Sequence, residues 1–307
     1  MNVYDYIEQT KYASPLVSVI IRTYGDRQSF LREAVTSVLK QKYENFEIVI
    51  VEDGGHNAQP FINELSSNSL LRIQYLPQPK VGRCVAGNIG LAAAKGEYFC
   101  FLDDDDRFYP EHLQILVEAV HQHNVLAAYT DAEEVSTTVK SLDPLIYKEL
   151  GRKVIYSQNF SRPLLWVQNY IAIQSVLFHR SLYERYGGLV THLDALEDWN
   201  LWTRYSLTDD FYHINKVTSM YRVPAKVDNS LERISKMDNF KAVARKEHQA
   251  MKLQMSVDEF LRMHDELNVH SCLIYIDKEM ARKCILENCV LRNCYGFLRK
   301  IYYYWRR

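Results

Sequence analysis

Between residues 16 and 131 the sequence alternates short apolar runs with amphipathic segments, and this alternation limits the possible folds more than any other feature. Apolar runs with the β-branched and aromatic composition of buried strands lie at 16–25, 46–55, 71–78, 97–102 and 125–131. Segments with apolar residues at helical spacing lie at 29–43, 60–66, 85–96 and 110–124. Strands that alternate with helices in this way predict an α/β fold, with a parallel sheet and helices on both faces.

Composition narrows the class of protein further. The chain has 307 residues, of which 47% are hydrophobic, and a formal net charge of −1, so no overall field favours nucleic acid as a partner. The first fifteen residues carry charges and lack the apolar stretch of a signal peptide, and no run reaches the roughly 18 apolar residues of a membrane span. The six cysteines form no CxxC pair, so we expect reduced thiols in the cytoplasm and no zinc site.

Polar clusters follow three of the predicted strands, where open parallel sheets bind their ligands. They read RTYGD after the first strand, EDGG after the second and DDDD after the fourth. Carboxylates at the end of a rigid strand suit Mg²⁺ or Mn²⁺, which take other ligands from phosphates and water. The alternative for the four aspartates is a solvated acidic turn before the helix at Pro110.

A second acidic pair, Glu197 and Asp198, precedes an aromatic helix in LDALEDWNLWTRYS. These acids either favour the helix dipole or include a general base, and spacing alone leaves both open. The chain has no GxxxxGK[ST], no GxGxxG after the first strand, no HExxH and no GxSxG. Those absences argue against a P-loop, a dinucleotide fold, a zincin and an α/β-hydrolase.

Taken in order, VSVIIRTYGD, IVIVEDGG, VGRCVAGNIGLAAAKGEYFCFLDDDDRFYP and LEDWNLW resemble the family 2 glycosyltransferases of the GT-A fold. The resemblance covers about residues 16–112 and 174–222. It implies a Rossmann-like, mostly parallel sheet flanked by helices, with a helical C-terminal extension. It also implies inverting, metal-dependent transfer of a sugar from a nucleotide sugar, often UDP-linked, to an acceptor hydroxyl.

The same resemblance assigns residues to the nucleotide sugar. They are Thr23 and Tyr24 for the nucleobase and ribose, Asp53 with Glu52 for the base, Arg83 and Asn88 on the following helix, and Asp103 and Asp104 for the ribose or sugar. The family usually reads DDGS where this chain has EDGG, so a hydroxyl is lost at Gly55.

For the reaction itself, the resemblance assigns the metal, Mn²⁺ or Mg²⁺, to Asp105 and Asp103. The run of four aspartates leaves this register open by one residue. Asp198 matches the proposed catalytic base, and Glu197 is expected to orient it or the acceptor. Gln174 and Ser175 are expected on the acceptor side, near the sugar.

Two tryptophans complete the acceptor-side candidates. Trp199 and Trp202 are placed to stack on a sugar ring, although aromatic residues three apart on a helix more commonly pack in the core.

We expect a catalytic domain over 1–230, with a nucleotide-sugar half at about 16–131 and an acceptor half at about 132–230. A helical region follows at 231–307. Its end, GFLRKIYYYWRR at 296–307, interleaves basic and aromatic residues. This composition suits binding to the cytosolic membrane surface, and the alternative is that the segment packs on the protein itself.

A glycan or lipid-linked saccharide is the expected acceptor, in surface polysaccharide synthesis. The alternatives are a sugar nucleotidyltransferase and a non-catalytic sugar-nucleotide binder or membrane scaffold.

Overall fold

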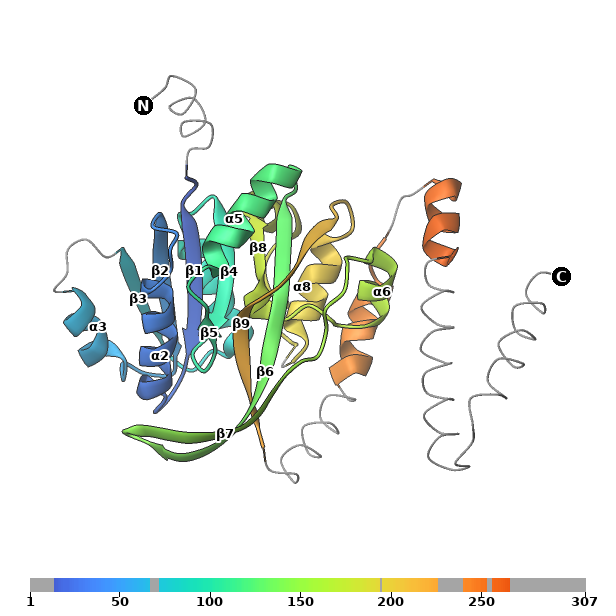
Figure 1. Ribbon diagram of the computed structural model, residues 1–307. Coiled ribbons are helices and arrows are strands. Elements are labelled where there is room, and N and C mark those ends of the chain that lie inside the picture. The colour runs from blue at the N-terminus through green and yellow to red at the C-terminus, as the bar shows by residue number, and fades with distance from the viewer. Residues whose placement is uncertain (1–13, 67–71, 194, 226–239, 253–255, 266–307) are drawn as a thin grey trace, which may run out of the picture. The chain divides into compact units, whose positions relative to one another are not determined.

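The computed structural model describes residues 14–66, 72–193, 195–225, 240–252 and 256–265. Its first half is the predicted alternating unit (Figure 1). The strands are β1 (Val17–Thr23), β2 (Phe46–Asp53), β3 (Ile73–Gln78) and β4 (Tyr98–Asp103). They pair in parallel in the order β3-β2-β1-β4. The helices of this half are α2 (Gln28–Leu39), α3 (Gln59–Ser66), α4 (Arg83–Ala93) and α5 (His112–His123).

Beyond β4 the sheet changes direction. β8 (Val176–His179) pairs antiparallel with both β4 and β6 (Ala127–Leu142), and β9 (Phe211–Pro224) runs parallel to β6. The short β5 (Arg107–Phe108) closes the far edge against β9. The sheet is therefore mixed rather than wholly parallel, and it curls from one half to the other.

A long hairpin leaves the body of the sheet (Figure 1). The outer part of β6 pairs antiparallel with β7 (Leu145–Val154), and both strands run past the end of β9. The strand predicted to end at residue 131 thus continues to Leu142, where its mostly polar outer half is held by pairing with β7 and β9.

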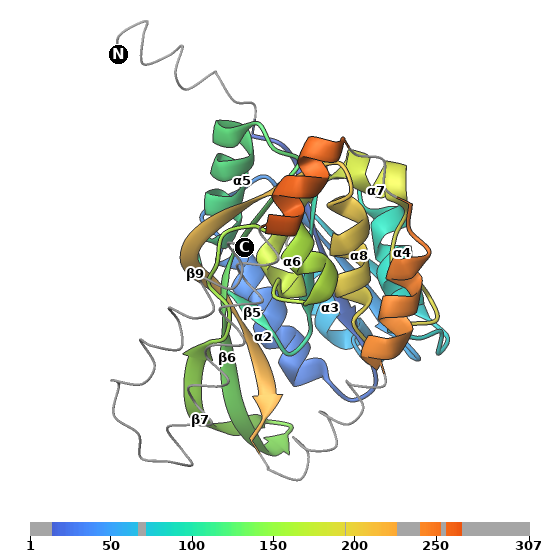
Figure 2. The ribbon, with the colours of Figure 1, turned by 90° about the vertical axis from the view of Figure 1, so that its right-hand side faces the viewer.

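Alternate side chains of the strands enter two cores, one on each face of the sheet. Ile20, Val49 and Phe101 point to a face covered by α4, α6 (Arg162–Val167), α7 (Arg180–Tyr186) and α8 (Glu197–Tyr205). Val19 and Ile48 point to the opposite face, covered by α2, α3 and α5. Figure 2 shows the first group of helices towards the viewer. Both faces of β1, β2 and β4 are buried, as their uninterrupted apolar runs predict.

The C-terminal region is described only in part. A helix at 240–249 belongs to the same compact unit, which extends through Leu253, and it buries Ala244 in the core. A second helix, at 257–265, belongs to a separate unit. The boundary expected near residue 230 and the tail at 296–307 lie outside the described residues. No helix in the described part of the chain has both the length and the apolar character that a bilayer crossing requires.

Candidate functional site

The site lies at the carboxyl ends of β1, β2 and β4, and its centre is a buried guanidinium. Arg22 and Asp103 are neighbours in the register of β1 and β4. Arg22 Nε donates to Asp103 Oδ1 at 2.8 Å, and its NH1 donates to Glu197 Oε1 at 3.1 Å. Burial alone would lower the pKa of Arg22, but Asp103 and Glu197 outweigh it and raise that pKa. The guanidinium therefore stays charged and ties the two acidic motifs together.

The four aspartates that begin at the last residue of β4 have different partners. Burial alone would raise the pKa of Asp103, but Arg22 and Arg83 hold it below its ordinary value. Asp104 is buried, accepts from Thr23 Oγ1 at 2.7 Å and pairs with Arg27.

Burial raises the pKa of Asp104 to about 6, even though Arg27 opposes the shift. Asp105 is more exposed and pairs with Arg27 at 2.7 Å. Asp106 is buried, accepts from the Arg222 amide at 3.2 Å, and has its pKa raised by burial and by Asp105.

A first cavity of about 330 Å³ opens beside these carboxylates. It is lined by Arg22, Thr23, Tyr24, Arg27, Asp53, Arg83, Ala86 and Asp103 to Asp105. Asp53 Oδ1 accepts from the amides of Val81 and Gly82, and its Oδ2 accepts from Lys80 Nζ at 2.7 Å. The cationic groups of Arg27 and Lys80 each lie about 5 Å from the centre of the exposed Tyr24 ring. An aromatic face and several cations suit a nucleotide that carries phosphates.

A second cavity, of about 420 Å³, adjoins the first. Its residues include Asp106, Asn169, Gln174, Glu197, Asp198 and Arg222. The two cavities share three lining residues, namely Arg83, Asp103 and Asp105. Arg83 NH2 lies 3.3 Å from Asp103 Oδ2 and 2.8 Å from Glu197 Oε1. A ligand in either cavity can therefore contact the shared wall formed by Arg83, Asp103 and Asp105.

Asp198 is the carboxylate of the second cavity with the strongest case for a chemical role. Its Oδ2 accepts from Asn169 Nδ2 at 3.2 Å, and its Oδ1 accepts from the Trp199 amide at 2.7 Å. Burial makes the largest contribution and the neighbouring Glu197 the next largest, and they raise the pKa of Asp198 to about 6. Such a group is ionised at neutral pH and has a higher proton affinity than an ordinary aspartate, as a general base requires.

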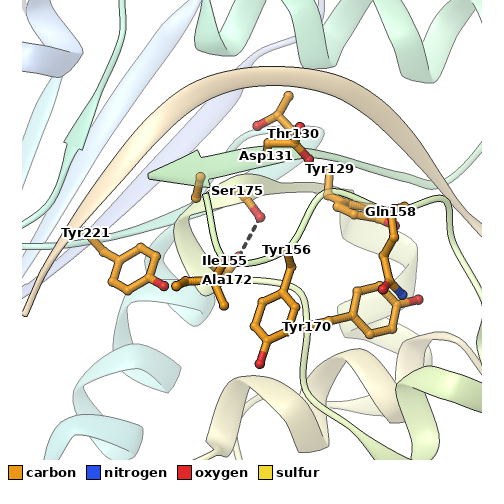
Figure 3. A pocket seen from close by; sticks show the side chains of 11 residues that line it. Tyr129, Thr130, Asp131, Ile155, Tyr156, Gln158, Tyr170, Ala172, Ser175 and Tyr221 are labelled. Carbon is orange, nitrogen blue, oxygen red and sulfur yellow. Dashed lines mark hydrogen bonds between the residues drawn. The ribbon is translucent and has the colours of Figure 1, made fainter. Parts of the chain in front are cut away.

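A small cavity of about 20 Å³, shown in Figure 3, adjoins the second one. Tyr156, Tyr170, Ala172 and Tyr221 line both. Ser175 Oγ donates to the Ala172 carbonyl at 2.7 Å and so stabilises the helical turn at residues 173–175 (Figure 3). The second cavity therefore ends against a wall of aromatic rings.

Several residues expected at the site lie elsewhere. Glu52 lines neither large cavity; its carboxylate accepts from the amides of Asn57 and Ala58, just before α3, and from the Tyr75 hydroxyl. Asn88 forms two hydrogen bonds with the backbone of Leu189 and so joins α4 to a loop.

The two tryptophans also lie away from the cavities. Trp199 and Trp202 are 2% and 0% exposed in the core, so neither can stack on a sugar in this structure. Of the two remaining acceptor-side residues, Gln174 lines the second cavity and Ser175 the small one.

The structure also brings in residues that the motifs did not indicate. Arg22, Arg27 and Arg222 pair with or donate to the four aspartates. Arg22 is the first residue of the RTYGD cluster and Arg27 directly follows it, so their positions were a usable signal. Asn169 lies between α6 and the helical turn η1 (Ile173–Ser175), in a region without a recognisable pattern.

The carboxylates of the site fit a divalent cation that also takes oxygen ligands from a bound phosphate. Among the described residues no three acidic, histidine or cysteine side chains are grouped to hold a metal ion. Asp103 and Asp105 nevertheless line both cavities at the shared wall. Mg²⁺ commonly uses one or two carboxylates and completes its shell with phosphate and water oxygens, so two carboxylates beside a phosphate-sized cavity are sufficient.

Comparison with known proteins gives one family. The family model described as Glycosyl transferase family 2 matches residues 18–187. An uncharacterized glycosyltransferase of Rickettsia felis is 35% identical over 41% of this chain, which spans 21% of that protein. The uncharacterized glycosyltransferase MJ1057 of Methanocaldococcus jannaschii is 26% identical over 76% of this chain and 79% of its own length.

Solved structures share the fold. Staphylococcus aureus TarS 1–349 in complex with UDP-GlcNAc aligns with a TM-score of 0.56 at 19% identity, over 74% of this chain and 66% of that one. The mannosyltransferase PcManGT of Pyrobaculum calidifontis, in complex with GDP-Man and Mn²⁺, aligns with a TM-score of 0.59 at 18% identity, over 94% of this chain and 80% of that one. These likenesses confirm the expected GT-A architecture.

Proposed function

The chain belongs to glycosyl transferase family 2, and from that premise we propose that it is an inverting, metal-dependent enzyme. The proposed donor is a nucleotide sugar, UDP-linked in the first instance, and the proposed acceptor is a hydroxyl of a glycan or lipid-linked saccharide. The observation that carries this proposal is the wall of Arg83, Asp103 and Asp105 between two cavities, with Asp198 on the far side.

In this proposal the first cavity holds the nucleotide. Tyr24 offers a face for the base, while Thr23 and Asp53 lie beside it. Arg27 and Arg83 lie close enough to the carboxylates to pair with a diphosphate placed at the wall. A divalent cation, when bound to Asp105 and Asp103, would offset charge on the leaving diphosphate. Cationic side chains already fixed at this place lower the cost of that charge without rearrangement.

The second cavity holds the acceptor in this proposal. Asp198 takes the proton of the attacking hydroxyl as its oxygen bonds to the anomeric carbon and the bond to the diphosphate breaks. Attack from the cavity opposite the leaving group inverts the anomeric configuration. Glu197 is held by Arg22 and Arg83 and serves as a fixed neighbour that keeps the proton affinity of Asp198 high.

The test is release of nucleoside diphosphate from a panel of nucleotide sugars with Mn²⁺, Mg²⁺ or EDTA. Metal-dependent release from one donor supports the proposal and names the sugar. Pyrophosphate as product would instead indicate a nucleotidyltransferase. If no donor reacts and metal-dependent binding of UDP and of GDP is also absent, the transferase proposal is wrong.

We also propose that the protein works in the cytoplasm, in surface polysaccharide synthesis, and contacts the membrane through residues 296–307. The basic and aromatic residues of that segment support this part of the proposal. A chain that ends before Gly296 is then expected to sediment less with anionic vesicles than the full chain. Equal sedimentation would rule out this segment as the anchor.

A further inference from the structure

One amide in the second cavity is only half satisfied. Asn169 Nδ2 donates to Asp198 Oδ2, but Asn169 Oδ1 is buried and has no partner among the described residues. A buried polar atom without a hydrogen bond costs about 1–3 kcal/mol, so it needs a specific explanation. Gln174 Nε2, on the same cavity, is likewise buried and unpartnered. Together they leave one unpaired acceptor and one unpaired donor on residues that line this cavity.

The contact between Asn169 and Asp198 is held from both sides. Before α6, the Ser161 amide donates to the Tyr170 hydroxyl at 2.9 Å, and that hydroxyl donates to the Ser161 carbonyl at 3.0 Å. These bonds hold the two ends of segment 161–170, which contains Asn169, against each other. On α8, the Trp199 indole donates to the Leu165 carbonyl of α6. The two elements cannot separate without breaking buried hydrogen bonds, so the contact is preorganised.

Asp198 has charged neighbours, but its side-chain hydrogen bond comes from Asn169. Glu197 precedes Asp198 on α8, and Arg83 faces it from α4. Arg83 is already paired with Glu197 and Asp103. The other ionisable residues on the cavity wall are Asp103, Asp105, Asp106, Tyr156, Tyr170, Tyr221 and Arg222. Among the described side chains, Asn169 is the one that donates a hydrogen bond to the Asp198 carboxylate.

We propose that Asn169 is a positioning residue, whose amide nitrogen orients the Asp198 carboxylate and whose free amide oxygen receives a hydroxyl of the acceptor. This inference rests on the proposed function and narrows its acceptor. The attacking hydroxyl gives its only proton to Asp198, so the hydrogen that Asn169 Oδ1 accepts comes from a second hydroxyl nearby. An acceptor with neighbouring hydroxyls, as in a sugar ring, meets both groups.

The first experiment follows the protonation of the Asp198 carboxylate and needs no substrate. Carboxyl ¹³C NMR of aspartate-labelled protein gives the titration midpoint of Asp198, whose signal is identified by its loss in Asp198→Asn. Asn169→Leu is expected to raise that midpoint by about one pH unit, because it removes a hydrogen bond to the charged form. Asn169→Asp is expected to raise it further through like charge. The matched control is Gln168→Leu, since Gln168 lines neither large cavity.

The outcomes separate this inference from the proposed function. An unchanged midpoint in Asn169→Leu overturns the inference, and if that variant does not fold, an unchanged midpoint in Asn169→Asp does so. The second readout is donor hydrolysis, with water as the acceptor. Asn169→Leu is expected to lower kcat at least about tenfold with the donor KM unchanged, because its contacts lie in the second cavity. A raised midpoint in a protein that hydrolyses no donor keeps the positioning contact and counts only against the proposed reaction.

Discussion

Replacing the buried guanidinium is the most direct test of how the site is held together. Arg22→Met keeps an unbranched apolar stem and removes the charged guanidinium, whose Cζ lies 5.6 Å from the centre of the Phe101 ring. Asp103 and Glu197 then lose their shared buried partner. Arg83 remains near both carboxylates, but the same nitrogen, NH2, makes both of its contacts. One exposed cation must therefore serve two acids that Arg22 served from within the core.

Removing one partner of a buried ion pair costs about 3–5 kcal/mol, because the other charge is left unpaired. Since Arg83 offsets part of that loss, we expect the lower end, about 3 kcal/mol. For a unit of this size that corresponds to a fall in Tm of about 6–12 °C. Arg22→Lys, which keeps the charge without the planar fork, should lose less.

The pH dependence of this stability loss tests whether unpaired carboxylate charge is its cause. The native pKa of Asp103 is lowered, so its pairing stabilises the fold above the unfolded pKa of about 3.9 and is lost as the pH falls through the native value. In Arg22→Met this pKa rises, and protonation relieves the unpaired charge. Urea unfolding should therefore show a larger loss at about pH 7 than at about pH 5. A loss below about 1 kcal/mol, or an equal loss at both pH values, would refute the reasoning.

Three further predictions concern the base and the packing under the site. Asp198→Asn should lower turnover by about 10²–10⁴-fold while the donor Kd, measured by calorimetry, stays the same. Because burial raises the pKa of Asp198 to about 6, wild-type turnover should fall as the pH drops below that value, and a flat profile down to about pH 4 would contradict its role. Gly90→Ala would push a methyl group into Ile20 and should destabilise the fold by about 1–3 kcal/mol in urea, whereas Gly151→Ala, which meets open space, should be neutral.

The sequence predicts the parallel half of the sheet well because three of its strands, β1, β2 and β4, are buried on both faces and read as apolar runs. β1 is buried throughout, and its predicted end is correct within two residues. The second half could not be predicted in the same way. The outer part of β6 and all of β7 have exposed positions, and their polar residues resemble a loop. The antiparallel entry of β8 beside β4 depends on contacts between distant segments.

The same distinction holds for the site. Acidic clusters at strand ends are visible in the sequence, and Asp103 to Asp105 do line a cavity. The partners of those acids are not visible, because Arg22 meets Asp103 only through the register of β1 and β4. Asn169 is absent from the prediction for the same reason, since its role depends on where α6 packs against α8.

The guanidinium of Arg83, which faces both cavities, has a consequence for the order in which ligands act. It contacts Asp103 and Glu197 at once, so a ligand that draws it towards one cavity changes the charge felt in the other. The two binding equilibria are then thermodynamically linked, and the linkage is reciprocal. Whatever factor a nucleoside diphosphate applies to acceptor affinity, the acceptor must apply to the nucleoside diphosphate.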